Sequence, residues 1–312
     1  MTLPSHIEFI ERGWLSANMV LLGGDLRGPL VVDTGYASHA PQTLALVAQH
    51  LQQEAHRGPR ALLNTHLHSD HCGGNGVLQA HYHARVWMPP AEFEAAEAWD
   101  ESLLSFEDTG QRCDRFVPHE RLQPGSRFEH GACLWEVHGA PGHDPASIIL
   151  FEPRLGLLIS ADALWEKGFG IVFPELAARP ALGTAFDEVE QTLDLIQALQ
   201  PAMVLPGHGP LFTDTAAALR EARSRLDYFR AEPLRHALHA GKALLMYHLL
   251  EWRERPRRTL EAWLETTPVQ QRLRTLAGVP DTQTWARQLL DSLCKAGQVL
   301  ADGPQVRLRA PQ

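Results

Sequence analysis

The sequence has no apolar run long enough to cross a membrane, and it has few cysteines. No stretch of about 18 consecutive apolar residues occurs in the chain, so we expect no transmembrane helix. The segment from Met1 to Ile10 lacks the basic and then apolar pattern of a secretion signal. The 4 cysteines are scattered without a paired spacing. We therefore expect a reduced, cytoplasmic protein without disulfides and without a membrane partner.

Acidic and basic residues are divided unevenly along the 312 residues. The formal net charge is −9, but residues 1–219 hold 12 lysines and arginines against 27 acidic residues, whereas residues 220–312 hold 16 against 10. The chain is long enough for one large domain or two, with a substantial core. The change in character after Phe212 favours an acidic core followed by a basic tail.

One short stretch holds four side chains that can bind metal. His66, His68, Asp70 and His71 fall within six consecutive residues, between an apolar run typical of a buried strand and a Gly-Gly pair that allows a tight turn. Imidazole and carboxylate groups suit zinc, and they also suit iron or manganese. Burying four such groups unpaired is costly, so we interpret the stretch as a metal site with ligands for two ions.

Three further ligand-type residues each follow an apolar, strand-like run. His143 lies in Gly142-His143-Asp144, Asp162 lies in Ser160-Ala161-Asp162-Ala163, and His208 lies in Pro206-Gly207-His208-Gly209. Strand ends that lead into loops are where a rigid sheet presents reactive groups. These three residues are therefore candidates for the same metal site.

In their order and spacing, these pieces resemble the metallo-β-lactamase superfamily, over the part of the chain that ends near Phe212. The resemblance rests on Val32-Asp33-Thr34-Gly35, the His66-to-His71 motif, Gly142-His143, Asp162 and Gly207-His208-Gly209. It implies an αββα sandwich with two metal ions at one edge of the facing sheets. Zinc is the first choice of metal, and iron and manganese stay open.

The resemblance also implies a role for each residue of the motifs. Asp33 is expected to support the metal loop without binding metal itself. The implied ligands are His66, His68 and His143 for the first ion, Asp70, His71 and His208 for the second ion, and Asp162 as the bridge between them.

Strand and helix signals alternate in the first part of the chain, which favours a layered α/β (α+β) fold. The predicted elements are a β-hairpin at 18–22 and 29–33, a helix at 41–54, strands at 60–64, 128–143 and 147–162, and a helix at 187–200. We predict a four-layer αββα metallo-β-lactamase sandwich, with its catalytic domain at residues 1–219.

The tail, residues 220–312, is predicted to be a mostly helical domain that resembles a winged helix. Helix signals lie at 233–251, 259–265 and 284–296, and a hairpin signal surrounds Asp302-Gly303. The basic cluster of Arg253, Arg255, Arg257 and Arg258 is compatible with phosphate contacts, although such a charge run is usually a solvated face. We favour a role in shaping the active site or in homodimerisation over nucleic-acid binding.

The implied ligand set points to hydrolysis. A hydroxide that bridges the two ions would attack a carbonyl or phosphoryl centre, and Asp70 would orient it or carry its proton. Our first choice of substrate is a small ester or thioester, that is, a small-molecule acyl compound. The alternative is an RNA endonuclease that uses the basic tail. A third interpretation is a metal-retaining signalling or binding module without activity.

Three local features have two interpretations each. Cys72 is either an extra ligand or nucleophile, or, as we favour, a small residue packed behind the metal loop. The loop at 163–175, with Trp165 and Phe169, forms either a pocket wall or part of the core. The acidic and aromatic segment at 89–120 forms either a wall of the active site or an ordinary surface helix.

Overall fold

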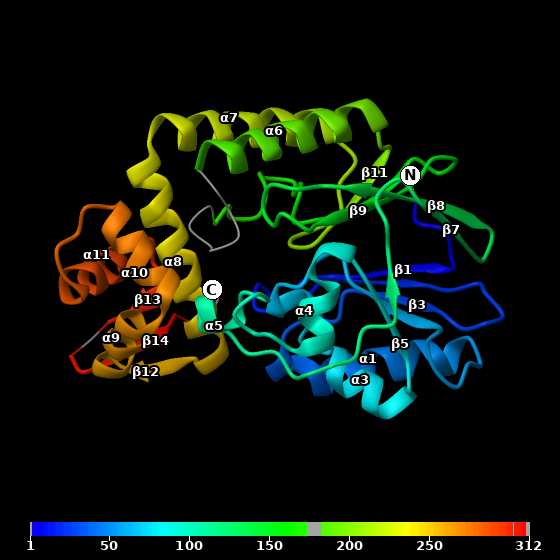
Figure 1. The fold of residues 1–312 in the computed structure, drawn as a ribbon, viewed down its shortest axis with the longest axis horizontal. Helices are drawn as coiled ribbons and strands as arrows, with labels where there is room; N and C mark the ends of the chain where they lie inside the picture. Colours follow the sequence, from blue (N-terminus) through cyan, green and yellow to red (C-terminus); the bar gives the residue numbers. More distant parts are fainter. Residues whose placement is uncertain (1, 174–181, 302, 310–312) are drawn as a thin grey trace.

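A computed structural model describes residues 2–173, 182–301 and 303–309, and Figure 1 shows its architecture. Pro174 and Glu175, from the predicted loop after Asp162, lie outside the described residues, as does Asp302 of the predicted terminal hairpin.

The first sheet has the strand order β1-β2-β3-β4-β5-β6. Its strands are β1 Ile7–Ile10, β2 Met19–Leu22, β3 Leu30–Val32, β4 Ala61–Leu63, β5 Arg85–Met88 and β6 Glu120–Arg121. β2 and β3 pair antiparallel with Val20 opposite Val32, which confirms the predicted hairpin. β3, β4 and β5 run parallel, so their carboxyl ends lie at one edge of the sheet.

The second sheet has the strand order β11-β10-β9-β8-β7. Its strands are β7 Arg127–His130, β8 Cys133–Gly139, β9 Ile148–Glu152, β10 Leu157–Ala161 and β11 Met203–Pro206. The prediction of single strands over 128–143 and 147–162 is wrong, because the chain turns within each range. Gly131 (φ 55°) lies between β7 and β8, and Gly156 (φ 59°) lies between β9 and β10. Glycine adopts this left-handed conformation at little steric cost, so an apolar run can reverse direction there.

Helices cover the outer faces of both sheets (Figure 1). The helices of this part are η1 Ala37–His39, α1 Ala40–Gln53, α2 Ser69–Cys72, α3 Asn75–Tyr82, η2 Pro90–Glu92, α4 Phe93–Ala98, α5 Phe106–Thr109, α6 Leu182–Leu199 and α7 Thr215–Ala231. α1 and α3 lie beneath the first sheet in the figure, and α6 and α7 cross over the second. The predicted helices at 41–54 and 187–200 are therefore confirmed as α1 and α6.

Buried side chains divide the first part into four layers. Val32 and Leu150, one from each sheet, belong to the core between the sheets. Their chain neighbours point to the opposite faces, as side chains of a strand must. Val31 packs in a core that includes Val47 of α1, and Ile149 packs in a core with α6 and α7. The predicted αββα sandwich is thus confirmed.

The C-terminal part has its own core, which includes Leu245, Trp285 and Val306. Its elements are α8 Pro233–Trp252, α9 Arg257–Thr266, α10 Pro268–Leu276 and α11 Thr282–Lys295, with a small antiparallel sheet of β12 Glu254–Pro256, β14 Gln305–Leu308 and β13 Val299–Leu300 in that order. The three predicted tail helices are confirmed as α8, α9 and α11. The description as a winged helix stays a prediction.

The predicted domain division between residues 219 and 220 falls within α7. The buried residues of α7 all pack in the core over the second sheet, whereas α8 begins the C-terminal core. The division itself stays a prediction. Within the described ranges, no helix is both long enough and apolar enough to span a bilayer.

Candidate metal centre

Three strand ends of the second sheet bring ligand-type side chains to one edge. β8 and β10 each pair antiparallel with β9, and β11 pairs parallel with β10, so β8, β10 and β11 all run in the same direction. His143 lies in the loop after β8, Asp162 directly follows β10, and His208 follows β11. Their common direction places all three at the same end of the sheet.

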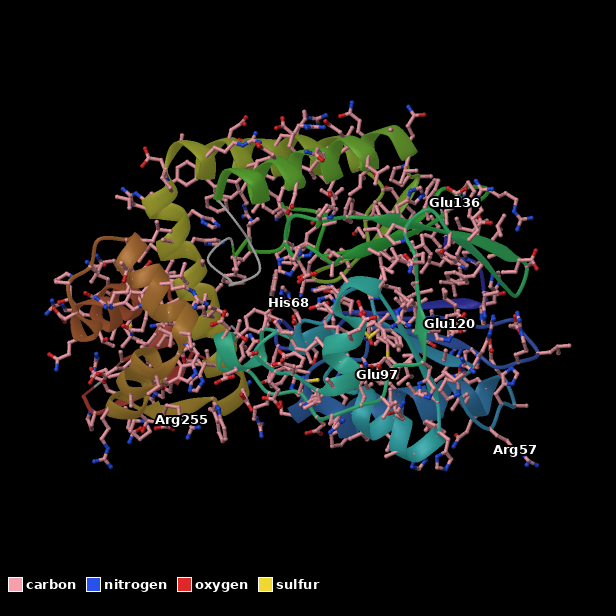
Figure 2. The ribbon with its side chains drawn as sticks, viewed as in Figure 1. Arg57, His68, Glu97, Glu120, Glu136 and Arg255 are labelled. Carbon is pink, nitrogen blue, oxygen red and sulfur yellow. The ribbon has the colours of Figure 1, made fainter. Side chains whose placement is uncertain are left out.

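The first sheet supplies the other side chains at the facing edge. His66 and His68 lie in the loop after β4, and Asp70 and His71 lie in the one-turn helix α2 that begins after His68. Figure 2 shows His68 between the two sheet layers, toward the C-terminal helices.

All seven predicted site residues come together. Their ligand atoms form three overlapping groups, each with all atoms within 4.8 Å of one another: His66, His68 and His143; His66, His71 and Asp162; Asp70, His71 and His208. The second group shares His66 with the first and His71 with the third, so the ligand atoms form a continuous cluster that fits two neighbouring cations. Their role as metal ligands stays a prediction.

Hydrogen bonds fix which ring nitrogen of two histidines faces the centre. Nδ1 of His71 lies 2.7 Å from Oδ2 of Asp33, and Nδ1 of His143 lies 2.5 Å from the carbonyl oxygen of Ile171. Both oxygens can only accept, so each Nδ1 carries the proton. In a ring that carries only this proton, Nε2 has a lone pair, which is the form that binds metal.

Three imidazole nitrogens meet at the first group. Nδ1 of His68 lies 3.1 Å from Nε2 of His66 and 2.7 Å from Nε2 of His143. Burial lowers the pKa of His143 to about 4, and burial together with the neighbouring histidines lowers the pKa of His66 well below its usual value. Both rings are therefore neutral near pH 7, as metal ligands must be.

The second group concentrates negative charge around His71. Burial opposes the charged form of this ring, but Asp33, Asp162 and Asp70 together raise the pKa of His71 well above its usual value. Its Nε2 is fully buried and makes no hydrogen bond to any described residue, although Oδ1 of Asp162 lies 3.4 Å away. A buried nitrogen that faces carboxylates without a hydrogen bond fits a cation-binding position, so the donor set fits divalent metal ions.

Asp33 supports the loop of His66 to His71 from behind, as the family resemblance implied. One carboxylate oxygen accepts from the backbone N–H of Thr65 (2.9 Å), and the other accepts from the Thr65 hydroxyl (2.8 Å) and from His71. Asp33 has φ 57°, a conformation that aspartate and asparagine tolerate better than most residues. Its carboxylate is thus held in place from three directions.

The sequence gave no indication of an aromatic residue that reaches the centre from the tail. The hydroxyl of Tyr247, in α8, donates to Oδ2 of Asp70 at 3.2 Å and lies 3.4 Å from Nε2 of His208. No local signal marks Tyr247, because it lies far from Asp70 in sequence and simply continues the helical pattern of α8.

Two tryptophans complete the wall beside His208. Trp14 stacks on the His208 ring, with centroids 5.2 Å apart and planes 4° apart. Trp165 meets the same ring edge-on, and its indole N–H donates to Oδ1 of Asp162 at 3.2 Å. Trp14 was not predicted, whereas Trp165 lies in the loop for which we considered a pocket wall.

The centre opens into a cavity of about 570 Å³ between the two parts of the chain. Both interpretations of the loop at 163–175 hold in part, since Trp165 and Phe169 line the cavity and Phe169 also belongs to the core over the second sheet. Thr109 and Gln111, from the segment at 89–120, line the cavity as well.

Cys72 lies outside the three ligand groups. It is fully buried, its sulfur is 3.5 Å from the carbonyl oxygen of Leu67 and 3.6 Å from the sulfur of Cys113, and burial raises the pKa of its thiol. These contacts agree with a small residue packed behind the metal loop.

Comparisons with known proteins agree with this site. The family model described as the metallo-beta-lactamase superfamily matches residues 12–208. The chain is 27% identical over 217 residues to the acyl-coenzyme A thioesterase MBLAC2 of Homo sapiens, which covers 64% of this chain and 75% of that protein. It is 32% identical over 119 residues to a hydroxyacylglutathione hydrolase of Cyanothece sp., which covers 36% of this chain and 39% of that protein.

One similar solved structure extends over nearly the whole chain. The beta-lactamase domain protein from Burkholderia ambifaria aligns with a TM-score of 0.60 at 19% identity, over 99% of this chain and 94% of that chain. At this identity the similarity concerns the fold alone. It includes the C-terminal part as well as the αββα sandwich.

Proposed function

Because this chain belongs to the metallo-beta-lactamase superfamily, we propose that it hydrolyses a small ester or thioester with two divalent cations as its cofactor. The chain is a hydrolase, as the names of its relatives also indicate. The bond that it cleaves and the metal that it uses belong to the proposal.

The observation that carries the proposal is that the seven ligand-type side chains gather beside one cavity, whose wall includes four of them. His68, Asp70, His143 and Asp162 are themselves part of the cavity wall. A concave, mostly apolar site with a few convergent polar groups is the usual form of a small-molecule site.

The proposed ligands are those that the family resemblance implied: His66, His68 and His143 for one cation, Asp70, His71 and His208 for the other, and Asp162 between them. When bound, such a pair of cations acidifies water and polarises a carbonyl oxygen. Zinc is our first choice, and iron and manganese fit the same nitrogen and oxygen donors.

Asp70 is the proposed catalytic residue among the ligands. Burial opposes its charged form, but His71 and His208 lower the pKa of Asp70, so it is a carboxylate near neutral pH. The Tyr247 hydroxyl orients this carboxylate through the hydrogen bond to Oδ2. Asp70 is thus placed to hold the attacking water, accept its proton and pass that proton to the departing sulfur or oxygen, so that the products are a carboxylic acid and a thiol or alcohol.

The cavity wall supports an acyl substrate over RNA. Phe169, Ile171, Leu244 and Leu250 give it apolar surface, which suits an acyl chain better than a phosphodiester backbone. The predicted basic cluster in the tail does not line the cavity: Arg255 lies over the ring of Trp252 at 3.7 Å, and Figure 2 shows it at the far edge of the C-terminal part from His68. We therefore treat RNA cleavage as the alternative function, and the experiment described next distinguishes the two.

The test is hydrolysis of a panel of thioesters, esters and lactones beside labelled single-stranded RNA by the metal-loaded protein. The control is an Asp162→Ala variant, whose metal content is measured in parallel by mass spectrometry. Turnover of an acyl compound that is lost in the variant supports the proposal. Asp162-dependent cleavage of RNA alone would replace it with the nuclease, and metal binding without turnover of any compound would favour the binding module.

A further inference from the structure

A group of basic side chains, here called the basic end, lines the same cavity as the metal ligands, about one to two turns of α8 before Tyr247. Arg225 of α7 and Lys242 and His239 of α8 line the cavity together with the metal-site residues. All three are half-buried. Neither the guanidinium of Arg225 nor the ammonium of Lys242 has an ion pair or hydrogen bond with any residue in the described part of the chain.

The three basic groups lie close enough to interact. Burial, together with the positive charges of Arg225 and Lys242, lowers the pKa of His239 to about 4. His239 is therefore neutral near pH 7 and can donate or accept a hydrogen bond. Among the described residues, the carboxylates that line the cavity are Asp70 and Asp162, which belong to the metal centre. The basic end thus lacks an internal counter-ion there.

A half-buried positive charge without a partner is unfavourable, because it loses hydration and no opposite charge compensates for that loss. A bound anion compensates for the lost hydration. Guanidinium and ammonium groups are well suited to bind carboxylate or phosphate oxygens. We propose that Arg225, Lys242 and His239 form an anion-binding subsite, so that the substrate carries a carboxylate or phosphate at a distance from its scissile carbonyl. The inference deepens the proposed function and rests on it.

The backbone at Gly168 gives Arg225 its place. Gly168 has φ 118°, a backbone conformation that favours glycine, and a Cβ there would lie 2.7 Å from Nη1 of Arg225, so the guanidinium packs closely against this turn. The carbonyl of Gly168 accepts from the backbone N–H of Trp165 at 2.7 Å, and the Trp165 indole donates to Asp162. A short turn therefore links the basic end to the metal centre and fixes their relative positions.

α8 sets the distance between the two ends. His239, Lys242 and Tyr247 share the helix face that lines the cavity, and Tyr247 touches Asp70. At 1.5 Å per residue, the two basic positions lie roughly 8–12 Å along the helix axis from Tyr247. This is about the length of three residues of extended chain. Short lactones and simple esters do not span it, whereas thioesters of a long anionic thiol do.

The experiment compares thioesters that share one acyl group and differ in the thiol. The thiols are N-acetylcysteamine, which is neutral, glutathione, which carries carboxylates, and coenzyme A, which carries phosphates. An adipyl thioester of N-acetylcysteamine places the anion on the acyl side. We expect kcat/KM for at least one anionic substrate to exceed that of its neutral counterpart by roughly tenfold or more, because charge-assisted hydrogen bonds are about twice as strong as neutral ones. The preference should weaken as salt is raised.

The variants Arg225→Gln and Lys242→Gln test the residues. Each should lower kcat/KM for the preferred anionic substrate by roughly tenfold. The value of kcat/KM for the neutral thioester should stay nearly the same. The matched control is Arg235→Gln, which removes the same charge from an exposed position of α8 that does not line the cavity. Lys242→Arg should retain most of the preference. Equal losses on neutral and anionic substrates, or no preference in the wild-type protein, would overturn the subsite.

Binding separates this inference from the proposed reaction. Calorimetric titration of the metal-loaded protein with S-methylglutathione and with S-methyl coenzyme A needs no turnover. If no thioester is hydrolysed but one of these ligands binds in a manner that depends on Lys242, the proposed reaction fails and the subsite stands. If neither ligand binds, or if Arg225→Gln and Lys242→Gln leave binding unchanged, the subsite is refuted.

Discussion

Replacing Asp33 by Asn should weaken metal binding without disturbing the backbone. Asn is isosteric with Asp and tolerates the positive φ of this position. Its remaining oxygen can still accept from the backbone N–H of Thr65, and the Thr65 hydroxyl can turn to accept from the new NH₂ group. The contact with His71 is different, because the NH₂ group would face the protonated Nδ1 at the position where Asp33 now accepts.

The clash of two donors forces His71 to move its proton to Nε2, which removes the lone pair that faces the centre. Partners that orient a ligand in this way typically account for 10- to 100-fold in metal affinity, which corresponds to about 1.4–2.7 kcal/mol. The short bond of 2.7 Å and the complete burial of His71 place the expected loss for the second cation toward the upper end of this range.

Two measurements check the prediction. Competitive titration with a chelator gives the affinity for each cation, and the ¹⁵N chemical shifts of the His71 ring report which nitrogen carries the proton. Thr65→Val is the comparison for the second cation, because it removes the hydroxyl contacts to Asp33 and to Nδ1 of His66 and leaves the Asp33–His71 contact in place. An Asp33→Asn protein with metal affinity within about twofold of the wild type and an unchanged His71 tautomer would refute the reasoning.

Three other perturbations have defined outcomes. Asp162→Ala should lower the metal content below two ions per chain and abolish hydrolysis; undiminished metal and rate would contradict its bridging position. Tyr247→Phe should lower kcat/KM by about tenfold at unchanged metal content, because it removes a hydrogen bond of about 1.5 kcal/mol to the Asp70 carboxylate; an unchanged rate would exclude the orienting role. Burial lowers the pKa of His236 to about 4, so between pH 6.5 and 4 the unfolded chain binds a proton that the folded protein does not, and stability falls on acidification. In urea unfolding at pH 7.5 and 5, His236→Phe, which keeps the aromatic contacts to Phe186 and Phe229, should reduce the pH-dependent loss by about 2 kcal/mol; an identical loss in the variant would show that another group is responsible.

The first part of the fold and the gathering of the seven side chains could be predicted because their signals are local. His66 to His71 are contiguous, and His143, Asp162 and His208 each follow an apolar run that ends in a small residue. Strands of one sheet that run in the same direction then bring such ends to one edge without further information. The hydrolase assignment came from the same local motifs, and the family match and the relatives confirm it.

Strand ends were less predictable than strand cores. In 128–143 and 147–162 the apolar pattern continues through the turns, so hydrophobicity alone gives one strand where the fold has two. Gly131 and Gly156 were the available signals, because each has the positive φ that a reversal of the chain requires. α10 was missed although Val269 and Leu273 have helical spacing and Pro268 occupies the first turn, where proline is favoured.

The tail residues of the site could not be predicted from sequence, since only tertiary packing brings them to it. Glu251, at the end of α8, accepts from the Tyr36 hydroxyl at 3.0 Å and pairs with Arg112. Arg272 of α10 pairs with Asp108 at 2.5 Å. These contacts join the C-terminal part to α5 and to the segments that hold Tyr36 and Arg112 in the first part. The helical pattern of α8 alone does not indicate which residues of the first part this helix will contact.

This packing gives the two parts of the chain different roles at the site. The strand ends of the sandwich hold every proposed metal ligand, and their positions depend on sheets whose core lies between Val32 and Leu150. α8 contributes Tyr247 at the metal centre and Lys242 further along the same face. A change in the orientation of α8 would therefore alter which substrates reach the centre without moving a ligand. Because α8 meets the first part through polar pairs and aromatic contacts that lie outside the core between the sheets, substrate selection can change through the tail while the hydrolytic centre is preserved.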